Sequence, residues 1–391
     1  MHIAILGRQP ALGMAELEHL YGAKNVRWFS DHTARVDAPS LTLDYLGGSL
    51  KTGRVVAELT NGDWHQASTK IVQLYIKKWS QNEGKITLGI SAYGFTVSTR
   101  DIQKTGLILK QKLKSSSASL RLIPNQEAAL NTATSHHNKL GLAANKVELL
   151  VIRADNRRVV IAESTGAQNI TGLARRDQGR PKRDTFVGML PPKLAQIMIN
   201  LASPGKQDDR PPRLLDPFCG TGVVLQEAAL MGYDVYGTDL AEKMVDYSKI
   251  NLQWLGETYH HSFNVTLQQG DAMEAIWQSP IDTVVCEGYL GQPFSAPPSP
   301  EKLQQVIKNC DHITSSFLKN IGRQIVPGTP LCLAVPAWRD KNGHFSHLPL
   351  THKLERLGYT SFIFTHLSPS DLLYYREDQV VARELLVLIK A

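Results

Sequence analysis

The chain has 391 residues, of which 42% are hydrophobic and 20% are charged. These values exclude a disordered or fibrous chain and indicate two or three globular domains. With 43 lysines and arginines against 36 acidic residues, the formal net charge is +7, which favours a polyanionic partner but does not identify one.

The four cysteines are widely spaced and form no C-x-x-C pair. This spacing argues against a disulfide framework or a zinc site, so we expect no metal. No apolar run is long enough to span a membrane, and the opening stretch 1–7 is too short for a secretory signal. We therefore expect a cytoplasmic protein with no membrane partner.

The first 60 residues alternate between strand-like and helix-like patterns. We expect strands over 1–6, 26–36 and 54–59, with helices over 11–21 and 41–47. These three strands and two helices are interpreted as part of the β-α-β-β-α-β arrangement of a small ferredoxin-like domain, which we assign to residues 1–60.

Residues 61–165 form a second predicted unit. Its expected elements are helices over 65–79, 102–113 and 126–131, a strand over 85–93, and a hairpin of strands over 146–153 and 157–163. Four lysines, at 104, 110, 112 and 114, lie in or just after the second helix. A solvated helix face and a phosphate-contacting face are both consistent with them.

Residues 166–202 are interpreted as a linker and a lead-in helix. A basic run over 175–183 precedes Pro191 and Pro192, which are suited to the first turn of a helix. Apolar residues then recur at helical spacing, at Leu194, Ile197, Met198 and Leu201.

The stretch 213–222 reads Arg-Leu-Leu-Asp-Pro-Phe-Cys-Gly-Thr-Gly, an apolar strand that enters a glycine turn and then a helix over 223–231. A second strand ends at Asp239, 23 residues after Asp216, near the offset at which an acidic side chain meets ribose hydroxyls. Leu225 replaces the third glycine of a dinucleotide motif, and two carboxylates beside the turn disfavour a phosphate. The pattern therefore favours a nucleoside that carries a cationic group.

Further along, a strand over 265–269 is followed by Asp271 and Ala272, and a strand over 281–286 ends in Glu-Gly-Tyr-Leu-Gly at 287–291. The remaining pattern predicts a helix over 301–322, a strand over 331–336, a helix over 350–357, and two final strands over 361–366 and 380–389. The whole of 203–391 is thus predicted to be one α/β domain.

Asp-Pro-Phe-Cys-Gly-Thr-Gly resembles the first motif of class I S-adenosylmethionine (SAM) methyltransferases that modify exocyclic amines of nucleic-acid bases. Arg-Asp-x-Gly-Arg-Pro, followed by Gly-Met-Leu-Pro-Pro-Lys-Leu-Ala, resembles the segment that leads into the catalytic domain of THUMP-containing tRNA guanine-N2 methyltransferases. The resemblance implies a Rossmann-like catalytic domain with a seven-stranded sheet over 203–391. It also implies a THUMP-like RNA-binding domain over 61–165 that docks the acceptor end of tRNA.

The resemblance also implies which residues hold the cofactor, SAM. The implied cofactor-binding residues are Asp216, Phe218, Gly220, Gly222, Asp239, Leu240, Asp271 and Ala272. For Asp271, a role in contacting the adenine edge and a role in capping a short helix predicted over 273–277 are equally consistent with the local sequence.

The turn at 287–291 departs from the family pattern of Asp or Asn, Pro, Pro and an aromatic residue. Glu287 takes the acidic position and is the candidate acceptor for an amine N–H, while Tyr289 is a candidate for stacking on a flipped base. An alternative register puts Cys286 in the acidic place and Tyr289 on the aromatic one, but it loses the match of Gly291.

The expected activity is SAM-dependent methyl transfer to an exocyclic amine of a tRNA base, by analogy N2 of the guanosine at position 10. Two alternatives stay open. One is a DNA amino-methyltransferase acting on adenine N6 or cytosine N4, and the other is a protein that binds SAM and RNA without catalysis.

Overall fold

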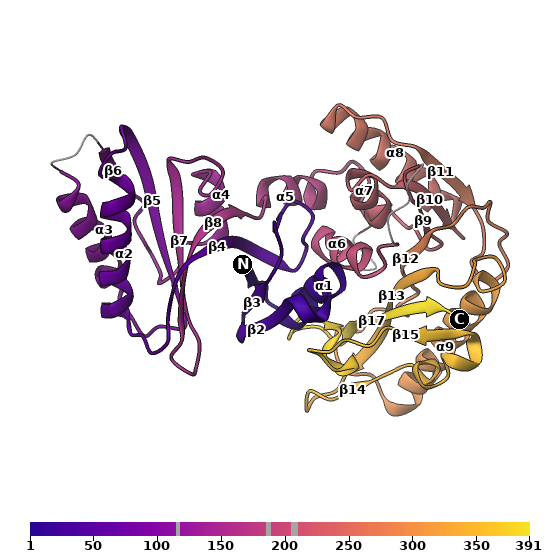
Figure 1. Ribbon diagram of the computed structural model, residues 1–391. Helices are drawn as coiled ribbons and strands as arrows, with labels where there is room; N and C mark the ends of the chain where they lie inside the picture. The colour runs from indigo at the N-terminus through magenta and orange to yellow at the C-terminus, as the bar shows by residue number, and fades with distance from the viewer. Residues whose placement is uncertain (115–117, 185–188, 205–209) are drawn as a thin grey trace. The chain divides into compact units, whose positions relative to one another are not determined.

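The computed structural model describes residues 1–114, 118–184, 189–204 and 210–391. The chain divides into two compact units, an N-terminal unit (Met1–Gly172) and a C-terminal unit (Leu173–Ala391). Each unit is built around one β-sheet (Figure 1). Across the described residues, no helix is both long and apolar enough to cross a bilayer.

The N-terminal unit has an eight-stranded sheet in the order β2-β3-β1-β4-β8-β7-β5-β6. Its strands are β1 (His2–Leu6), β2 (Val26–Ser30), β3 (Thr33–Val36), β4 (Ser49–Leu59), β5 (Gly84–Tyr93), β6 (Ala118–Leu122), β7 (Lys146–Arg153) and β8 (Val159–Ala167). Its helices are α1 (Pro10–Tyr21), α2 (Trp64–Trp79), α3 (Thr99–Lys112) and α4 (Thr132–His137), and α5 (Ile170–Gln178) crosses the boundary between the units.

Helices α2 and α3 cover one side of this sheet (Figure 1). Their apolar residues, including Ile71, Tyr75 and Ile102, form one core with buried side chains of β5, β6, β7 and β8. Helix α2 begins with a capping box, in which the Asp63 side chain accepts the N–H of Gln66 and the Gln66 side chain accepts that of Asp63.

The long strand β4 pairs with β1 on one side and with β8 on the other. Strands from 1–60 and from 61–165 therefore hydrogen-bond into the same sheet. The sequence predicted these ranges as separate domains, and that finer division remains a prediction.

Two helices predicted for this unit are wrong. Residues 41–47 are not helical, because the Glu16 carboxylate accepts the N–H groups of Gly47 and Gly48, each at 2.9 Å, and holds the segment as a loop. Residues 126–131 are also a loop, and α4 starts after Asn131, whose side chain caps it. The single strand predicted over 26–36 is a hairpin of β2 and β3.

The C-terminal unit has a sheet whose main path is β11-β10-β9-β12-β13-β17-β15, with β14 paired to β13 and β16 to β17. Its strands are β9 (Arg213–Asp216), β10 (Asp234–Asp239), β11 (Val265–Gln269), β12 (Thr283–Glu287), β13 (Pro330–Arg339), β14 (Phe345–Ser346), β15 (Tyr359–Ser361), β16 (Leu373–Tyr374) and β17 (Val381–Lys390). Its helices are α6 (Pro192–Leu201), α7 (Val223–Leu230), α8 (Glu242–Tyr259) and α9 (Pro300–Ile321).

Strands β9 to β13 run parallel, and β17 is inserted antiparallel between β13 and β15. The main path has the predicted number of seven strands, but the strand predicted over 361–366 is instead β15 (Tyr359–Ser361), and residues 362–366 are not in a strand. The helix predicted over 350–357 is instead two 3-10 turns, Pro349–His352 and Glu355–Leu357. The carboxyl ends of β9, β10 and β12 lie at one edge of the sheet, where ligands of open α/β sheets bind.

Candidate active site

The glycine turn after β9 depends on two residues with positive φ. Gly220 has φ +49° and Gly222 has φ +79°, a region that side chains other than glycine rarely adopt. A Cβ on Gly222 would lie 2.9 Å from Oγ of Ser248, whereas a Cβ on Gly220 would meet nothing closer than 3.9 Å. Gly222 therefore permits close packing of the turn against α8, and Gly220 leaves open space in front of the turn.

Asp239, the last residue of β10, fastens this turn. Its Oδ2 accepts the N–H of Gly220 at 2.9 Å, and its Oδ1 accepts the N–H of Ala241 at 3.0 Å. Each carboxylate oxygen has a second lone pair that these bonds do not use. Asp239 therefore fixes the backbone of the turn and still offers acceptor sites to a ligand.

Asp216, at the end of β9, is almost completely buried. Burial raises the pKa of its carboxyl well above the usual range, and the nearby charges of Asp239 and Glu287 raise it further. A hydrogen bond of 3.1 Å from the N–H of Phe218 acts in the opposite direction. Bringing these three carboxyls together has an electrostatic cost that a cationic ligand would reduce.

One pocket of about 590 Å³ lies at this edge of the sheet, within the usual size range of cofactor sites. It collects all but one of the residues predicted to form the site. Those that line it are Asp216, Phe218, Gly220, Asp239, Leu240, Asp271, Ala272, Glu287 and Tyr289. Gly222 does not line it and contributes through the shape of the turn.

Asp271 lines the pocket and also caps the turn that follows it. Its Oδ1 accepts the N–H of Met273 at 2.9 Å, and its backbone oxygen accepts the N–H groups of Glu274 and Ala275. The capping interpretation is thus seen in the structure, and it is compatible with a second role. The short helix expected after Asp271 is only a turn.

Glu287 ends β12, and its Oε1 accepts a hydrogen bond from Nε of Arg383 on β17. The Glu287 side chain is 21% exposed and that of Arg383 is 9% exposed, so the ion pair is largely shielded from water. Burial raises the pKa of Glu287, and the guanidinium of Arg383 opposes that rise. Cys286, the acidic-place residue of the alternative register, is fully buried in the core.

Residues 180–325 match the sequence profile of the UPF0020 family, described as an RMKL-like methyltransferase domain. The matched stretch lies within the C-terminal unit and includes the glycine turn and the Glu287 turn. The match includes every residue of the predicted site.

Two curated relatives carry the name tRNA (guanine(10)-N2)-dimethyltransferase. The protein from Methanothermobacter thermautotrophicus is 34% identical over 166 residues, which cover 42% of this chain and 44% of that protein. The protein from Pyrococcus abyssi is 48% identical over 107 residues, or 27% of this chain and 26% of that protein. These matches therefore span less than half the length of the relatives.

Among solved structures, TrmN from Thermus thermophilus superimposes with a TM-score of 0.52 and 16% sequence identity. The alignment covers 100% of this chain and 99% of that chain. At this identity the comparison concerns the fold, and it extends the likeness over both units.

Buried polar contacts hold Arg176 and Lys182 of the lead-in segment. Arg176 makes a bidentate ion pair with Glu227 of α7, with Nε–Oε1 and Nη2–Oε2 distances of 2.5 and 3.0 Å. Asn251 of α8 accepts the N–H of Lys182 at 2.9 Å, and it donates to the oxygens of Lys182 at 2.9 Å and Thr221 at 2.8 Å. One side chain thus joins this segment to the glycine turn.

The pocket also has lining residues that sequence reasoning missed. Asp184, Met189 and Leu190 reach the pocket from the lead-in segment, and Met244 and Ile313 reach it from α8 and α9. Arg383 was missed as well. Among the described residues, no group of three His, Cys, Asp or Glu side chains is arranged to hold a metal.

Proposed function

We propose that this protein is a SAM-dependent RNA methyltransferase that methylates an exocyclic amine of a tRNA base, N2 of a guanosine at a position like 10. One observation carries the proposal. The glycine turn, Asp239 and the Glu287 turn line one pocket, and all of them lie in the stretch that matches a methyltransferase domain. The names of the relatives, which belong to those proteins, support the choice of tRNA and of guanine N2.

The pocket residues fit SAM in charge and in shape. Carboxyls of Asp216, Asp239 and Glu287 complement a ligand that carries a sulfonium and an ammonium group. The open space beside Gly220 lets a ligand approach the turn closely. In this proposal Asp239 holds the ribose hydroxyls, Asp271 meets the adenine edge, and Phe218, Leu240 and Ala272 form the apolar walls.

When bound, SAM supplies an electrophilic methyl group, and transfer to the amine nitrogen breaks the methyl–sulfur bond and leaves neutral S-adenosylhomocysteine. An exocyclic amine is a weak nucleophile because its lone pair conjugates with the ring. An ionised Glu287 that accepts one amine N–H raises the electron density on nitrogen and is placed to take up the proton that nitrogen loses. Tyr289, which is 41% exposed, offers a face on which the base stacks.

The N-terminal unit is proposed to bind the RNA, with a ferredoxin-like part over 1–60 and a THUMP-like part over 61–165 that docks the acceptor end. The lead-in segment over 166–202 and the catalytic domain over 203–391 complete this division. The proposal is consistent with the net charge of +7, because phosphate contacts by lysine and arginine dominate RNA affinity.

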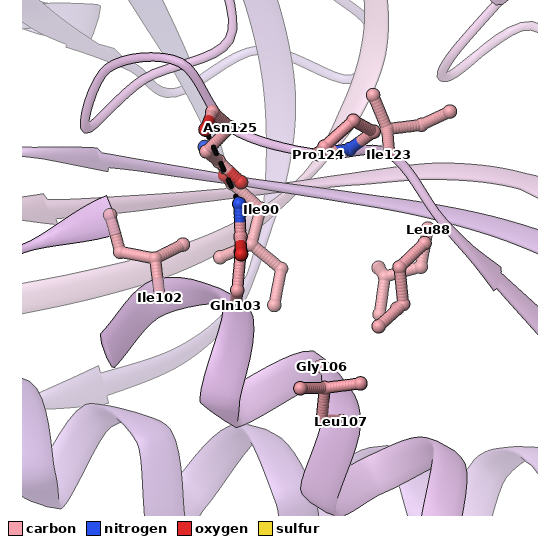
Figure 2. Close-up of a pocket in the computed structure, with 10 residues that line it drawn as sticks. Leu88, Ile90, Ile102, Gln103, Gly106, Leu107, Ile123, Pro124 and Asn125 are labelled. Atoms are coloured by element: carbon pink, nitrogen blue, oxygen red, sulfur yellow. Dashed lines mark hydrogen bonds between the residues drawn. The ribbon is translucent and has the colours of Figure 1, made fainter. Parts of the chain in front are cut away.

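A small apolar pocket of about 190 Å³ between α3 and the strands β5 and β6 supports this role (Figure 2). Gly106 and Leu107 of α3 line one side, and Gln103 donates a hydrogen bond of 3.3 Å to the backbone oxygen of Asn125 on the other. Arg100 and Lys110 are exposed, and their spacing places them on the same face of α3 as Gln103 and Leu107. The pocket has room for one unstacked base, and the cations are placed for the adjoining phosphates.

The decisive experiment incubates the protein with methyl-labelled SAM and a tRNA transcript, and then analyses nucleosides by mass spectrometry. We expect N2-methylated guanosine, and we expect it to disappear when guanosine 10 of the transcript is replaced by adenosine. Methylated adenine or cytosine in duplex DNA would instead support the DNA amino-methyltransferase. Tight binding of SAM and tRNA without turnover would support the non-catalytic alternative.

Docking of the acceptor end is tested separately by measuring the affinity for tRNA with and without its single-stranded 3′ end. We expect Leu107→Asp to weaken binding of the intact tRNA and to have little effect on the shortened one, because the substitution places a charge at the apolar pocket. Equal weakening for both RNAs would contradict this docking mode.

A further inference from the structure

The turn that carries Glu287 lacks the two prolines that give rigidity to the family pattern. Without them, the backbone of Glu287-Gly288-Tyr289-Leu290 does not by itself determine where the carboxylate points. The structure shows what replaces the prolines, because the Glu287 carboxylate has a charged partner on another strand.

The partner reaches Glu287 across the intervening strand β13. In register, Glu287 lies beside Ala334, and Ala334 lies beside Leu385 of β17. Residues in register share a face of a sheet, and residues two apart on one strand share it too, so Arg383 lies on the same face as Glu287. Ala334 is fully buried and small, which leaves space for the arginine side chain above β13.

The geometry points to Arg383 as a positioning residue that orients the Glu287 carboxylate toward the pocket for recognition of the target amine. Only Oε1 of Glu287 meets the guanidinium. Within the described part of the chain, Oε2 has no hydrogen-bond partner, and Glu287 lines the pocket. The pair therefore uses one oxygen for orientation and leaves the other for an N–H donor.

The electrostatic surroundings make this partner necessary. Asp216 of β9 is an acidic residue that interacts electrostatically with Glu287, and Cys286 precedes Glu287 on β12. Strand β13 contributes Ala334 and Pro336, which carry no charge, and Tyr289 and Asp239 stand elsewhere in the pocket wall. Among these residues Arg383 is the cation. Without it, burial and the charge of Asp216 both favour the protonated form of Glu287. A protonated Glu287 has no carboxylate with which to accept a hydrogen bond from the amine.

This inference rests on the proposed function. It predicts that the methyl transfer depends on pH through the protonation of Glu287. In the wild type, Arg383 opposes the rise in the pKa of Glu287, so activity is retained to lower pH. In Arg383→Met, the pKa of Glu287 rises and the acid limb of the kcat profile moves to higher pH. At pH 7 we expect kcat to fall by about 100-fold, within the range for a proton acceptor in the transition state, while the Kd for SAM changes by less than about threefold.

The experiment compares kcat against pH for wild type, Arg383→Lys and Arg383→Met. Arg383→Lys keeps the charge and should restore part of the activity and of the wild-type acid limb. The matched control is Arg210→Met, because Arg210 makes a bidentate ion pair with Asp282 at the opposite end of β12, with distances of 2.7 and 2.9 Å. That control should leave the acid limb where it is in the wild type.

A loss of activity in Arg383→Met at every pH, with the acid limb unmoved, would assign Arg383 a merely structural role and overturn the inference. Full activity of the variant would overturn it as well. If the wild type has no turnover, the proposed function fails, and the inference is judged by ¹³C NMR titration of the Glu287 carboxyl. An equal pKa in the wild type and in Arg383→Met would overturn it there.

Discussion

The pocket has a proposed cofactor half and a proposed acceptor half, which are built in different ways. The cofactor half consists of the turn after β9 and the end of β10, and its backbone is fastened by Asp239, 19 residues from Gly220. The acceptor half consists of the turn after β12, and its carboxylate is fastened by Arg383, 96 residues away. Local hydrogen bonds to the backbone thus shape the first half, and one long-range ion pair shapes the second.

This difference separates two kinds of failure. Damage to the cofactor half should remove SAM binding and, with it, every later step. Damage to the acceptor half should leave SAM bound and remove the methyl transfer. Ranking variants by these two readouts tests whether the halves are independent.

The largest effect is expected for Asp239→Ala. The substitution removes the acceptor of the Gly220 and Ala241 N–H groups and the proposed ribose contact, so the Kd for SAM should rise by about 100-fold or more. Isothermal titration calorimetry measures it. Asp234→Ala is the matched control, because Asp234 lies at the other end of β10 and accepts from Asn264. An unchanged SAM affinity in Asp239→Ala would contradict the assignment of this pocket to SAM.

Glu287→Gln should produce the complementary result. The amide is nearly the same shape and still accepts from Arg383, but it carries no charge to stabilise the developing positive charge on the amine nitrogen. We expect kcat to fall by about 100-fold, while the Kd for SAM stays within about threefold of the wild type. Single-turnover kinetics with tRNA separates the two quantities. Wild-type kcat in this variant would show that Glu287 is not the amine acceptor.

The sequence predicts which residues of the cofactor half come together, and it predicts those of the acceptor half only in part, for a physical reason; the roles of both sets remain proposals. A glycine turn after an apolar strand, with an acidic residue at the end of the next strand, is a local pattern, and parallel strands bring their ends together without further information. Arg383 is recognisable only once the register of β12, β13 and β17 is known. The same holds for Asn251, which meets Lys182 across 69 residues.

The wrong helix over 41–47 has a related cause. The buried Glu16 carboxylate accepts the N–H groups of Gly47 and Gly48 and stabilises a loop in place of the predicted helix. Tertiary hydrogen bonds of this kind override local propensity.

A smaller effect is expected for Asn251→Ala, which removes the link between the lead-in segment and the glycine turn. Three hydrogen bonds of a fully buried side chain are lost, and the N–H of Lys182 and the oxygen of Thr221 lose a partner. We expect SAM to bind about tenfold more weakly, because the turn and the lead-in segment no longer hold each other in place. Gln253→Ala, an exposed change on the same helix, should bind SAM like the wild type. Equal affinities for the two variants would show that the link does not affect the cofactor half.

The smallest effect is expected for Gly222→Ala, measured against Gly232→Ala. Both glycines have positive φ, +79° and +89°, so each substitution costs about 1–2 kcal/mol of backbone strain. A Cβ at 222 would also lie 2.9 Å from Oγ of Ser248, whereas one at 232 has nothing within 4 Å. Thermal unfolding of the two variants should therefore give a lower Tm for Gly222→Ala, by a few degrees. Because the clash pushes the turn away from α8, SAM affinity should fall for Gly222→Ala alone. An equal loss of SAM affinity in both variants would mean that general destabilisation, and not the shape of the turn, limits SAM binding.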